Sequence, residues 1–327
     1  MAITRLAAIL AEKQQELGGS SYSHYKKRSG LEKTVLKIPL SEGGLDDDSL
    51  RELGAMAALK PHKNIVEFLG VVMIEKKLCF LTGYCARGSL DRLHHKYDMT
   101  SERKFLVIAS NIADGLEHLH SNDIIHRVDL ACRNLLMTED GCVVICDYGL
   151  SKKLTANQSS YKVNTSKFPW PWTSPQSLET HRFDKAADIW SFGVTLWELL
   201  TKGATPYAEH CLASSSLEVM KGIKEGKVSL KVPNDSPEVC RDLVADCLKY
   251  ETKARPSAVV LARKIRMLLN DKQPYQQSGD IEVVPYAAAS AVENYGEAVP
   301  GAVAASDYAH GEDFEVEYAQ PAPPGGP

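Results

Sequence analysis

Hydrophobic residues follow two different periods along the chain. Between about residues 17 and 81 the apolar stretches are short and rich in β-branched residues, and a helical period occurs over 48–59. Short apolar runs of this kind predict strands, whereas apolar residues spaced three or four apart predict a helix. We therefore expect a small, mostly β part that carries one helix. Its predicted strands are 33–38, 65–73 and 78–81.

A helical period takes over after Gly88-Ser89-Leu90. Apolar residues recur at helical spacing over five long segments, which are 103–120, 186–202, 216–225, 237–249 and 258–269. Helices of this kind pack their apolar faces against a shared core. The pattern predicts a second, mostly helical part.

The two ends of the chain differ from both parts. Residues 1–16 have apolar side chains at helical spacing, which predicts a short amphipathic helix. The apolar run 6–11 is too short for a signal peptide or a membrane span. Beyond residue 272 Lys and Arg are absent, and acidic residues, Ala, Gly, Val and Pro replace the core pattern. This composition predicts disorder over 273–327.

Composition narrows the class of protein further. A chain of 327 residues allows one large two-lobed domain or two ordinary ones, with ample material for a buried core. Its net charge of -4 argues against nucleic acid or an anionic membrane as the main partner. The eight cysteines include no CxxC pair, and most lie in apolar runs, so we interpret them as small core residues. These features fit a reducing, cytoplasmic compartment.

Three oxygen-bearing side chains lie around one predicted hairpin. Asp129 and Asn134 stand five apart on a polar loop, and Asp147 ends the strand-like segment that follows. A hairpin brings its two ends together, so these side chains suit an acceptor hydroxyl and magnesium-bound phosphates. The alternative is a helix-capping Asp with a turn-forming Asn and Asp.

The stretch IIHRVDLACRNL, followed by Asp147-Tyr148-Gly149, resembles the catalytic loop and metal-binding triplet of protein kinases. The resemblance implies that Asp129 accepts or orients the proton of the acceptor hydroxyl, and that Asn134 and Asp147 hold magnesium. Val128 is an extra residue between Arg127 and Asp129. Because the spacing on both sides is regular, we expect the insertion to affect Arg127 more than the catalytic Asp.

Segments upstream resemble the nucleotide-binding half of the same family. Lys37, in Val35-Leu36-Lys37, matches the lysine that holds the α- and β-phosphates of ATP, and Glu52 matches the helix glutamate that pairs with it. In LCFLTGYC, Thr82 would stand at the gate of the adenine pocket, and backbone groups at Gly83 and Cys85 would pair with adenine.

The glycine-rich phosphate loop departs from the family pattern. Its counterpart is Leu17-Gly18-Gly19-Ser20-Ser21-Tyr22-Ser23, in which Gly18 and Gly19 remain but Ser23 stands where the third glycine is expected. The resemblance implies that ATP binds under a looser lid.

Downstream segments resemble the substrate groove and its support. Gln176 replaces the glutamate that pairs with the arginine matched by Arg255, and Asp188 would accept backbone hydrogen bonds from the catalytic loop. Because Gln keeps a carbonyl acceptor, we expect the replacement to be tolerated.

The acceptor residue is indicated by Leu-Ala-Cys-Arg133-Asn, which resembles the L-A-A-R-N of tyrosine kinases. The resemblance implies that Arg133 is one of the catalytic residues. Tyr161 matches the activating tyrosine of such kinases, where phosphorylation would engage Arg127. The alternative is an exposed loop tyrosine without a regulatory role.

Tail tyrosines with mostly acidic surroundings would be phosphorylated and then bound by phosphotyrosine-reading domains. These are Tyr286, Tyr295, Tyr308 and Tyr318.

Taken together, the resemblance implies an α+β, two-lobed protein kinase fold with a β-rich N-lobe, one αC helix and a helical C-lobe. The expected activity is ATP- and Mg²⁺-dependent transfer of phosphate to tyrosines in an acidic context, including the chain's own. Two alternatives remain: a pseudokinase scaffold, and a phosphotyrosine docking protein that acts through its tail. The expected divisions are an extension over 1–16, the N-lobe and hinge over 17–87, the C-lobe over 88–272 and the tail over 273–327.

Overall fold

A computed structural model describes residues 22–25, 34–37, 59–74, 77–94, 96–127, 129–147, 151–163 and 168–270. Over 22–25, 34–37 and 71–81 it describes the backbone alone. The predicted N-terminal helix, the helix over 48–59 and the tail over 273–327 lie outside these ranges. Within the described residues, no helix is both long enough and apolar enough to cross a membrane.

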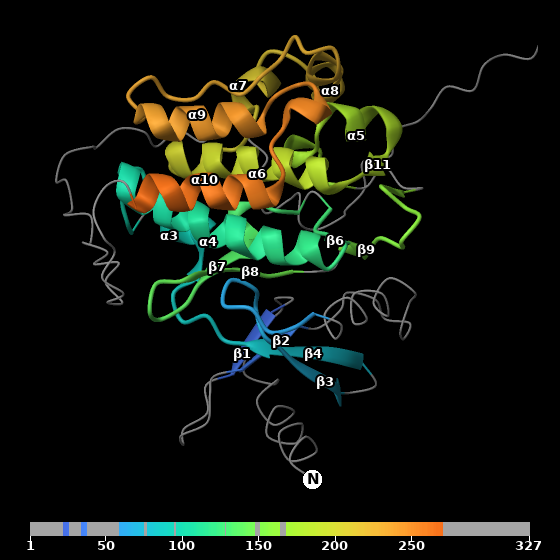
Figure 1. The fold of residues 1–327 in the computed structure, drawn as a ribbon, viewed down its shortest axis with the longest axis vertical. Helices are drawn as coiled ribbons and strands as arrows, with labels where there is room; N and C mark the ends of the chain where they lie inside the picture. The colour runs from blue at the N-terminus through green and yellow to red at the C-terminus, as the bar shows by residue number, and fades with distance from the viewer. Residues whose placement is uncertain are drawn as a thin grey trace, which may run out of the picture. The chain divides into compact units, whose positions relative to one another are not determined.

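A four-stranded antiparallel sheet forms the first part (Figure 1). Its strands, in the order β1-β2-β4-β3, are β1 (Tyr22–Tyr25), β2 (Thr34–Lys37), β4 (Lys77–Gly83) and β3 (Phe68–Ile74). All three predicted strands are confirmed. The strand predicted over 65–73 begins later, at Phe68, because Ile65 forms an isolated parallel bridge with Ile145 instead of joining the sheet.

Helices dominate the second part. The longer ones are α4 (Glu102–Ser121), α6 (Lys185–Leu200), α8 (Ser216–Lys224), α9 (Glu238–Cys247) and α10 (Ala258–Asn270). These confirm the five predicted helices, with ends moved by at most two residues. The shorter ones are α3 (Leu90–Leu93), α5 (Pro175–Thr180), α7 (Ala208–Cys211) and the 3₁₀ helices η2 (Cys132–Asn134), η3 (Trp170–Trp172) and η4 (Thr252–Ala254).

The core of the helical part forms around α6. In Figure 1, α10 runs along α4, and α6 lies with α9 in the same bundle. Apolar residues of these helices, such as Phe105, Ile112, Phe192 and Leu243, are completely buried. Helix α6 is buried on all its faces from Ala187 to Leu200. It begins at Asp184, whose side chain accepts a hydrogen bond from the Ala187 backbone N–H and so caps the helix.

Short strands position the loops between these helices. The three-stranded sheet β5-β7-β8 contains β5 (Gly88–Ser89), β7 (Leu135–Met137) and β8 (Val143–Ile145), which confirms the strand predicted before Asp147. Two further pairs join β6 (Ile124–Ile125) to β9 (Lys152–Lys153) and β10 (Tyr161–Lys162) to β11 (Arg182–Phe183). Two-residue strands carry no periodic signal, so the sequence did not predict them.

Buried Asn64 ties the segment before β3 to the hairpin β7–β8 and to α4. Its Nδ2 group donates to the Val143 carbonyl and to Asn111 Oδ1, both at 2.9 Å, while its own carbonyl accepts from the Ile145 N–H at 2.9 Å. These bonds satisfy polar groups that burial would otherwise leave unpaired. They also hold strand β8, and with it the segment that leads to Asp147.

Candidate active site

The end of hairpin β7–β8 brings together the three predicted oxygen-bearing residues. Leu135 pairs with Ile145, so Asn134 directly precedes one strand and Asp147 follows closely after the other. The Cys146 N–H donates to the Asn134 carbonyl at 3.0 Å and extends this pairing. Asn134 Nδ2 donates to the Asp129 carbonyl at 2.9 Å and brings the preceding loop to the same place.

The Asp129 carboxylate is held by a residue of its own loop. Arg133 Nη2 donates to Asp129 Oδ1 at 2.7 Å, and both side chains are largely shielded from solvent. The Arg133 guanidinium lies over the ring of Trp172, 4.4 Å from its centroid. This cation–π contact fixes a long side chain that would otherwise sample many rotamers. The structure therefore brings Arg133 and Asp129, both predicted as catalytic residues, into direct contact.

A buried glutamate on α6 completes this arrangement. Trp172 Nε1 donates to Glu198 Oε2 at 2.8 Å, and the Cys132 N–H donates to the same oxygen at 3.2 Å. Burial raises the pKa of Glu198 to about 7. Neither Trp172 nor Glu198 is predicted from the sequence as a site residue. The sequence feature that could have pointed to Glu198 is an acidic residue at an inward-facing position of the apolar run Thr195-Leu-Trp-Glu-Leu-Leu.

Asp188 supports the residues before the catalytic loop. Its carboxylate accepts hydrogen bonds from the His126 and Arg127 N–H groups, each at 2.8 Å, and His120 Nε2 lies 2.8 Å from Oδ2. This confirms the role predicted for Asp188. Arg127 has a φ of 64°, so the chain turns at this residue. Val128 itself lies outside the described residues, and its two neighbours, Arg127 and Asp129, are held by different partners.

The side chains at the hairpin end suit magnesium. Asn134 provides an amide oxygen and Asp147 a carboxylate, and hard oxygen ligands are those that Mg²⁺ prefers. Magnesium is commonly bound by one or two carboxylates together with substrate phosphates rather than by a cage of protein ligands. Among the described residues, no group of three or more His, Cys, Asp and Glu side chains could hold a metal.

The predicted nucleotide-binding residues fall on the first sheet and on the segment after it. Lys37 ends β2, opposite Tyr22 and Phe80, and Ser23 lies in β1 opposite Leu36. Thr82 and Gly83 end β4. Gly18, Gly19 and Glu52 lie outside the described residues, so the expected pairing of Lys37 with Glu52 stays a prediction.

The segment after β4 is fixed by backbone bonds. The Gly83 N–H donates to the Glu67 carbonyl at 2.9 Å, and the Cys85 carbonyl accepts from the Gly88 N–H at 3.2 Å. The Cys85 side chain is buried, which raises the pKa of its thiol to about 11. Its thiol is therefore a packing group, and only its backbone is available for the adenine contact that the sequence predicts.

Tyr161 lies in β10, paired with Phe183 of β11, and is partly buried. The ammonium of Lys152, a buried residue, lies 5.5 Å from the centre of the Tyr161 ring. Arg182 pairs with Lys162 in the same ladder, and its Nη1 donates to the neighbouring Ser160 Oγ at 3.4 Å. The structure thus places Lys152 over Tyr161, and the engagement of phosphorylated Tyr161 by Arg127 stays a prediction.

Gln176 takes the place expected for the partner of Arg255. Arg255 Nη2 donates to Gln176 Oε1 at 2.6 Å, and Gln176 Nε2 donates to the Tyr250 carbonyl at 2.7 Å. Burial lowers the pKa of Arg255 to about 10. The amide therefore provides the acceptor that the sequence analysis expected it to keep.

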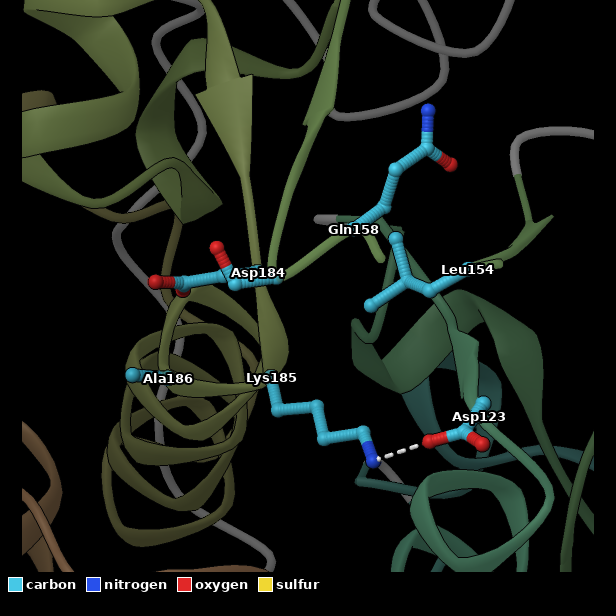
Figure 2. Close-up of a pocket in the computed structure, with 7 residues that line it drawn as sticks. Asp123, Leu154, Gln158, Asp184, Lys185 and Ala186 are labelled. Atoms are coloured by element: carbon cyan, nitrogen blue, oxygen red, sulfur yellow. Dashed lines mark hydrogen bonds and ion pairs between the residues drawn. The ribbon is translucent and has the colours of Figure 1, made fainter. Parts of the chain in front are cut away.

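A pocket of about 270 Å³ lies between the end of α4, the segment 154–159 and the start of α6. Figure 2 shows Lys185 and Asp123 pointing toward each other across it, with Nζ 2.7 Å from Oδ1. The hydrogen bond from Lys185 lowers the pKa of Asp123. The described residues that line this pocket include none of the residues predicted for catalysis or nucleotide binding.

Comparison with known proteins agrees with this geometry. Residues 21–265 match the family model described as protein tyrosine and serine/threonine kinase. The chain belongs to the protein kinase family. Its fold is therefore the two-lobed α+β kinase fold, in which the β1–β4 sheet belongs to the N-lobe and the helical part is the C-lobe.

Similar proteins place the chain in the tyrosine kinase group. It is 33% identical over 230 residues to ephrin type-A receptor 1 of Homo sapiens, which covers 70% of this chain and 23% of the receptor. It is 31% identical over 258 residues to tyrosine-protein kinase csk-1 of Caenorhabditis elegans, which covers 78% of this chain and 46% of that protein. The chain thus spans less than half the length of either relative.

Proposed function

We propose that the protein is a tyrosine kinase that transfers the γ-phosphate of ATP to tyrosine hydroxyls of proteins, with Mg²⁺ as the metal. The observation that carries this proposal is that Asn134 and Asp147 lie beside paired residues at the end of hairpin β7–β8, that Asn134 Nδ2 binds the Asp129 carbonyl, and that Arg133 holds the Asp129 carboxylate at 2.7 Å. A carboxylate in this position serves to orient an acceptor hydroxyl and to receive its proton.

Each predicted residue has a place in this proposal. Phosphoryl transfer depends mainly on positioning and on neutralisation of charge, because its transition state is loose. Asp129 would hold the acceptor hydroxyl. Asn134 and Asp147 would hold magnesium, which neutralises phosphate charge when it is bound. Lys37, kept in place by Glu52, would contact the phosphates.

The remaining predicted residues would bind the rest of the nucleotide. Backbone groups at Gly18, Gly19 and Ser23 would cover the phosphates, and those at Gly83 and Cys85 would bind adenine beside Thr82. Ser23 lies in strand β1, opposite Leu36. Its backbone N–H, which would contact the phosphates, is therefore held by the strand. We expect the lobes and the tail to follow the divisions predicted from the sequence.

Tyrosine as the acceptor is supported by two observations. One is the sequence Leu130-Ala131-Cys132-Arg133-Asn134, and the other is the likeness to proteins named as tyrosine kinases or ephrin receptors. The seven cysteines that the structure describes are all free, which supports a cytoplasmic location for this domain. Substrates would be proteins with a tyrosine in an acidic context.

Tyr161 is proposed as a site of autophosphorylation. The phosphate would carry up to two negative charges at neutral pH. It would meet Lys152, whose ammonium lies 5.5 Å from the Tyr161 ring, and Arg182, which binds the neighbouring Ser160. Lys152 is buried, so its attraction for a phosphate is less screened than that of a surface lysine. A Tyr161→Phe variant would lack the activation that follows preincubation with ATP.

The decisive experiment compares two Asp→Asn variants in the same hairpin region. The purified chain is incubated with ATP, Mg²⁺ and an acidic tyrosine peptide, and phosphotyrosine is measured by mass spectrometry. Asp129→Asn should lower kcat by roughly 10²- to 10⁴-fold while the KM for ATP stays unchanged, because Asp129 orients the acceptor rather than the nucleotide. The matched control is Asp140→Asn, an exposed turn residue between β7 and β8, which should retain full activity.

Two outcomes would support the rival functions. Absence of phosphotyrosine from the wild-type chain, with ATP binding retained or lost, would indicate a pseudokinase scaffold. Capture of phosphotyrosine-reading domains that survives Asp129→Asn, after another kinase has phosphorylated the tail, would indicate a docking protein.

A further inference from the structure

One face of α6 carries a stripe of polar side chains, although the helix is buried. Asp188, Ser191, Thr195 and Glu198 recur every three or four residues, and all four are buried. Positions at this spacing lie on the same face of a helix. Each of them hydrogen-bonds to the catalytic loop or to Trp172. The stripe is therefore the surface on which the catalytic loop rests.

The two ends of the stripe contact different parts of the loop. Asp188 accepts from the N–H groups of His126 and Arg127, before the extra residue Val128. Glu198 accepts from the Cys132 N–H, after the catalytic Asp129. The stripe thus restrains the loop on both sides of Asp129, and its downstream end binds the residue next to Arg133, which holds the Asp129 carboxylate.

A continuous series of contacts runs from this downstream end to the reacting group. Glu198 accepts from Trp172 Nε1 at 2.8 Å, Arg133 lies 4.4 Å from the centre of the Trp172 ring, and Arg133 binds the Asp129 carboxylate at 2.7 Å. An indole N–H that donates to a carboxylate makes its ring richer in electrons, and such a ring attracts a guanidinium more strongly. The negative charge of Glu198 therefore acts on Arg133 through Trp172.

We propose that Glu198 is a positioning residue for phosphoryl transfer, which holds Trp172 and the Cys132 backbone and through Arg133 keeps the Asp129 carboxylate in its working orientation. This proposal rests on the kinase function proposed above. Glu198 does not contact substrate. Its effect on the rate comes from restraining the acceptor-binding carboxylate, and misplacement of such a group by an ångström is enough to lower a rate up to 100-fold.

The ionisation of Glu198 adds a second measurable consequence of this proposal, a dependence on pH. The charged groups that face it are Arg133, which lowers its pKa, and Asp91 of α3, which raises it. The Cys132 thiol beside it is fully buried, and burial raises the pKa of that thiol well above its ordinary value, so it stays neutral. With a pKa of about 7, Glu198 changes charge close to neutrality, and protonation weakens both of its hydrogen bonds.

The test is a double-mutant cycle between Glu198 and Trp172. Glu198→Gln removes the charge but keeps the shape, and Trp172→Phe removes the N–H but keeps a ring. Each single variant should lower kcat by about tenfold and leave the KM for ATP unchanged. The double variant should be no slower than the slower single variant, because both changes break the same connection. Multiplied losses in the double variant would overturn the proposal.

The matched control is Trp197→Phe. Trp197 is the neighbour of Glu198 on α6, and its Nε1 donates to the Lys231 carbonyl at 2.8 Å, away from the catalytic loop. This variant loses an indole hydrogen bond of the same length, so it should lose stability to a similar degree but keep its kcat. A loss of kcat equal to that of Trp172→Phe would show that the effect is merely structural, and would contradict the proposal.

The pH dependence provides a readout that a structural role would not move. In the wild type, kcat should fall toward the value of Glu198→Gln as the pH decreases through about 7. In Glu198→Gln, kcat should not show this pH-dependent step. In parallel, the indole N–H resonance of Trp172, assigned by its loss in Trp172→Phe, should titrate over the same range in NMR spectra and stay constant in Glu198→Gln. A resonance that does not titrate in the wild type contradicts the proposal.

These readouts separate failure of the inference from failure of the proposed function. A wild-type chain without phosphoryl transfer, in which the Trp172 resonance still titrates through Glu198, would refute the kinase function and with it any catalytic role of Glu198. An active wild-type chain whose pH step persists in Glu198→Gln would refute the inference and leave the kinase function intact.

Discussion

Buried charged side chains are the most consequential single residues in this domain. Asp188 and Arg255 are both buried, and each makes several hydrogen bonds to backbone groups or to a polar side chain. A buried charge that loses its partners is strongly destabilising, whereas an exposed pair contributes little. The loss of stability caused by a substitution should therefore depend on the burial of the residue more than on its type.

Gln176 allows a direct test of this argument. Gln176→Ala removes the acceptor for Arg255 Nη2 and the donor to the Tyr250 carbonyl, and should lower the free energy of unfolding by about 2 kcal/mol in urea titrations. The control is Glu179→Gln on the same helix, α5. Its ion pair with Lys224 is partly exposed, so the change should be below about 1 kcal/mol. Equal effects of the two variants would show that Gln176 does not support Arg255.

The raised pKa of Glu198 predicts a dependence of stability on pH. In the folded state Glu198 binds its proton up to a pH of about 7, whereas in the unfolded chain its pKa is near the ordinary value of 4.5. Between these values the folded state holds the extra proton, so this residue makes the domain less stable as the pH rises toward about 7.

Glu198→Gln should abolish that contribution. The variant should gain stability relative to the wild type as the pH is raised from about 5 to about 8, by an amount on the order of 3 kcal/mol. Urea unfolding at the two pH values measures the difference. A constant difference in stability across this range would show that Glu198 titrates normally.

Among the elements, α6 is packed closely against both the catalytic loop and α9. Its polar stripe supports the catalytic loop, and Gly193 lies at the contact with α9. A Cβ on Gly193 would lie 2.6 Å from Cys247 Cβ and 2.9 Å from Leu248 Cδ2. The absence of a side chain at this position is what allows α6 and α9 to approach so closely.

Gly193→Ala separates helix propensity from packing. Propensity alone predicts that alanine stabilises a helix interior by about 1 kcal/mol. The close contact with α9 predicts the opposite sign, a loss of roughly 1–3 kcal/mol from overpacking. Thermal unfolding distinguishes them, and an increase in Tm would show that α9 can move away without loss.

At the scale of the whole molecule, the kinase domain is joined to a tyrosine-containing tail. The tail is present in the same chain, so any site on it is at a high effective concentration for the catalytic loop. We expect phosphorylation of the tyrosines at 286, 295, 308 and 318, which would then bind phosphotyrosine-reading domains through their arginines.

Replacement of these four tyrosines by Phe should abolish capture of such domains after incubation with ATP, because the phosphate acceptors are gone. Activity toward an acidic tyrosine peptide should be unchanged, since the catalytic residues are intact. Tyr275→Phe is the control, because Tyr275 lies in the same tail but has no acidic residue next to it. Pull-down with a purified SH2 domain measures the effect, and capture that persists in the fourfold variant would place the docking site elsewhere.

Local patterns in the sequence predicted the order and type of the longer elements and one part of the site. Five of the predicted helices and four of the predicted strands are confirmed, because hydrophobic periodicity reports on a single element at a time. The convergence of Asp129, Asn134 and Asp147 was also predictable, since all three flank one hairpin of adjacent strands. Asp188 and the Gln176–Arg255 pair were reached through the family resemblance rather than through periodicity.

The contacts that position these residues were decided only by the tertiary structure. Glu198 lies 66 residues from Cys132 and 26 from Trp172, and Lys152 comes to lie over Tyr161 through the short β10–β11 and β6–β9 pairs. Such contacts depend on how helices pack and on which short strands pair, and neither leaves a periodic trace in the chain. Sequence alone therefore determined which residues are available for catalysis. Long-range packing decided what holds them in place.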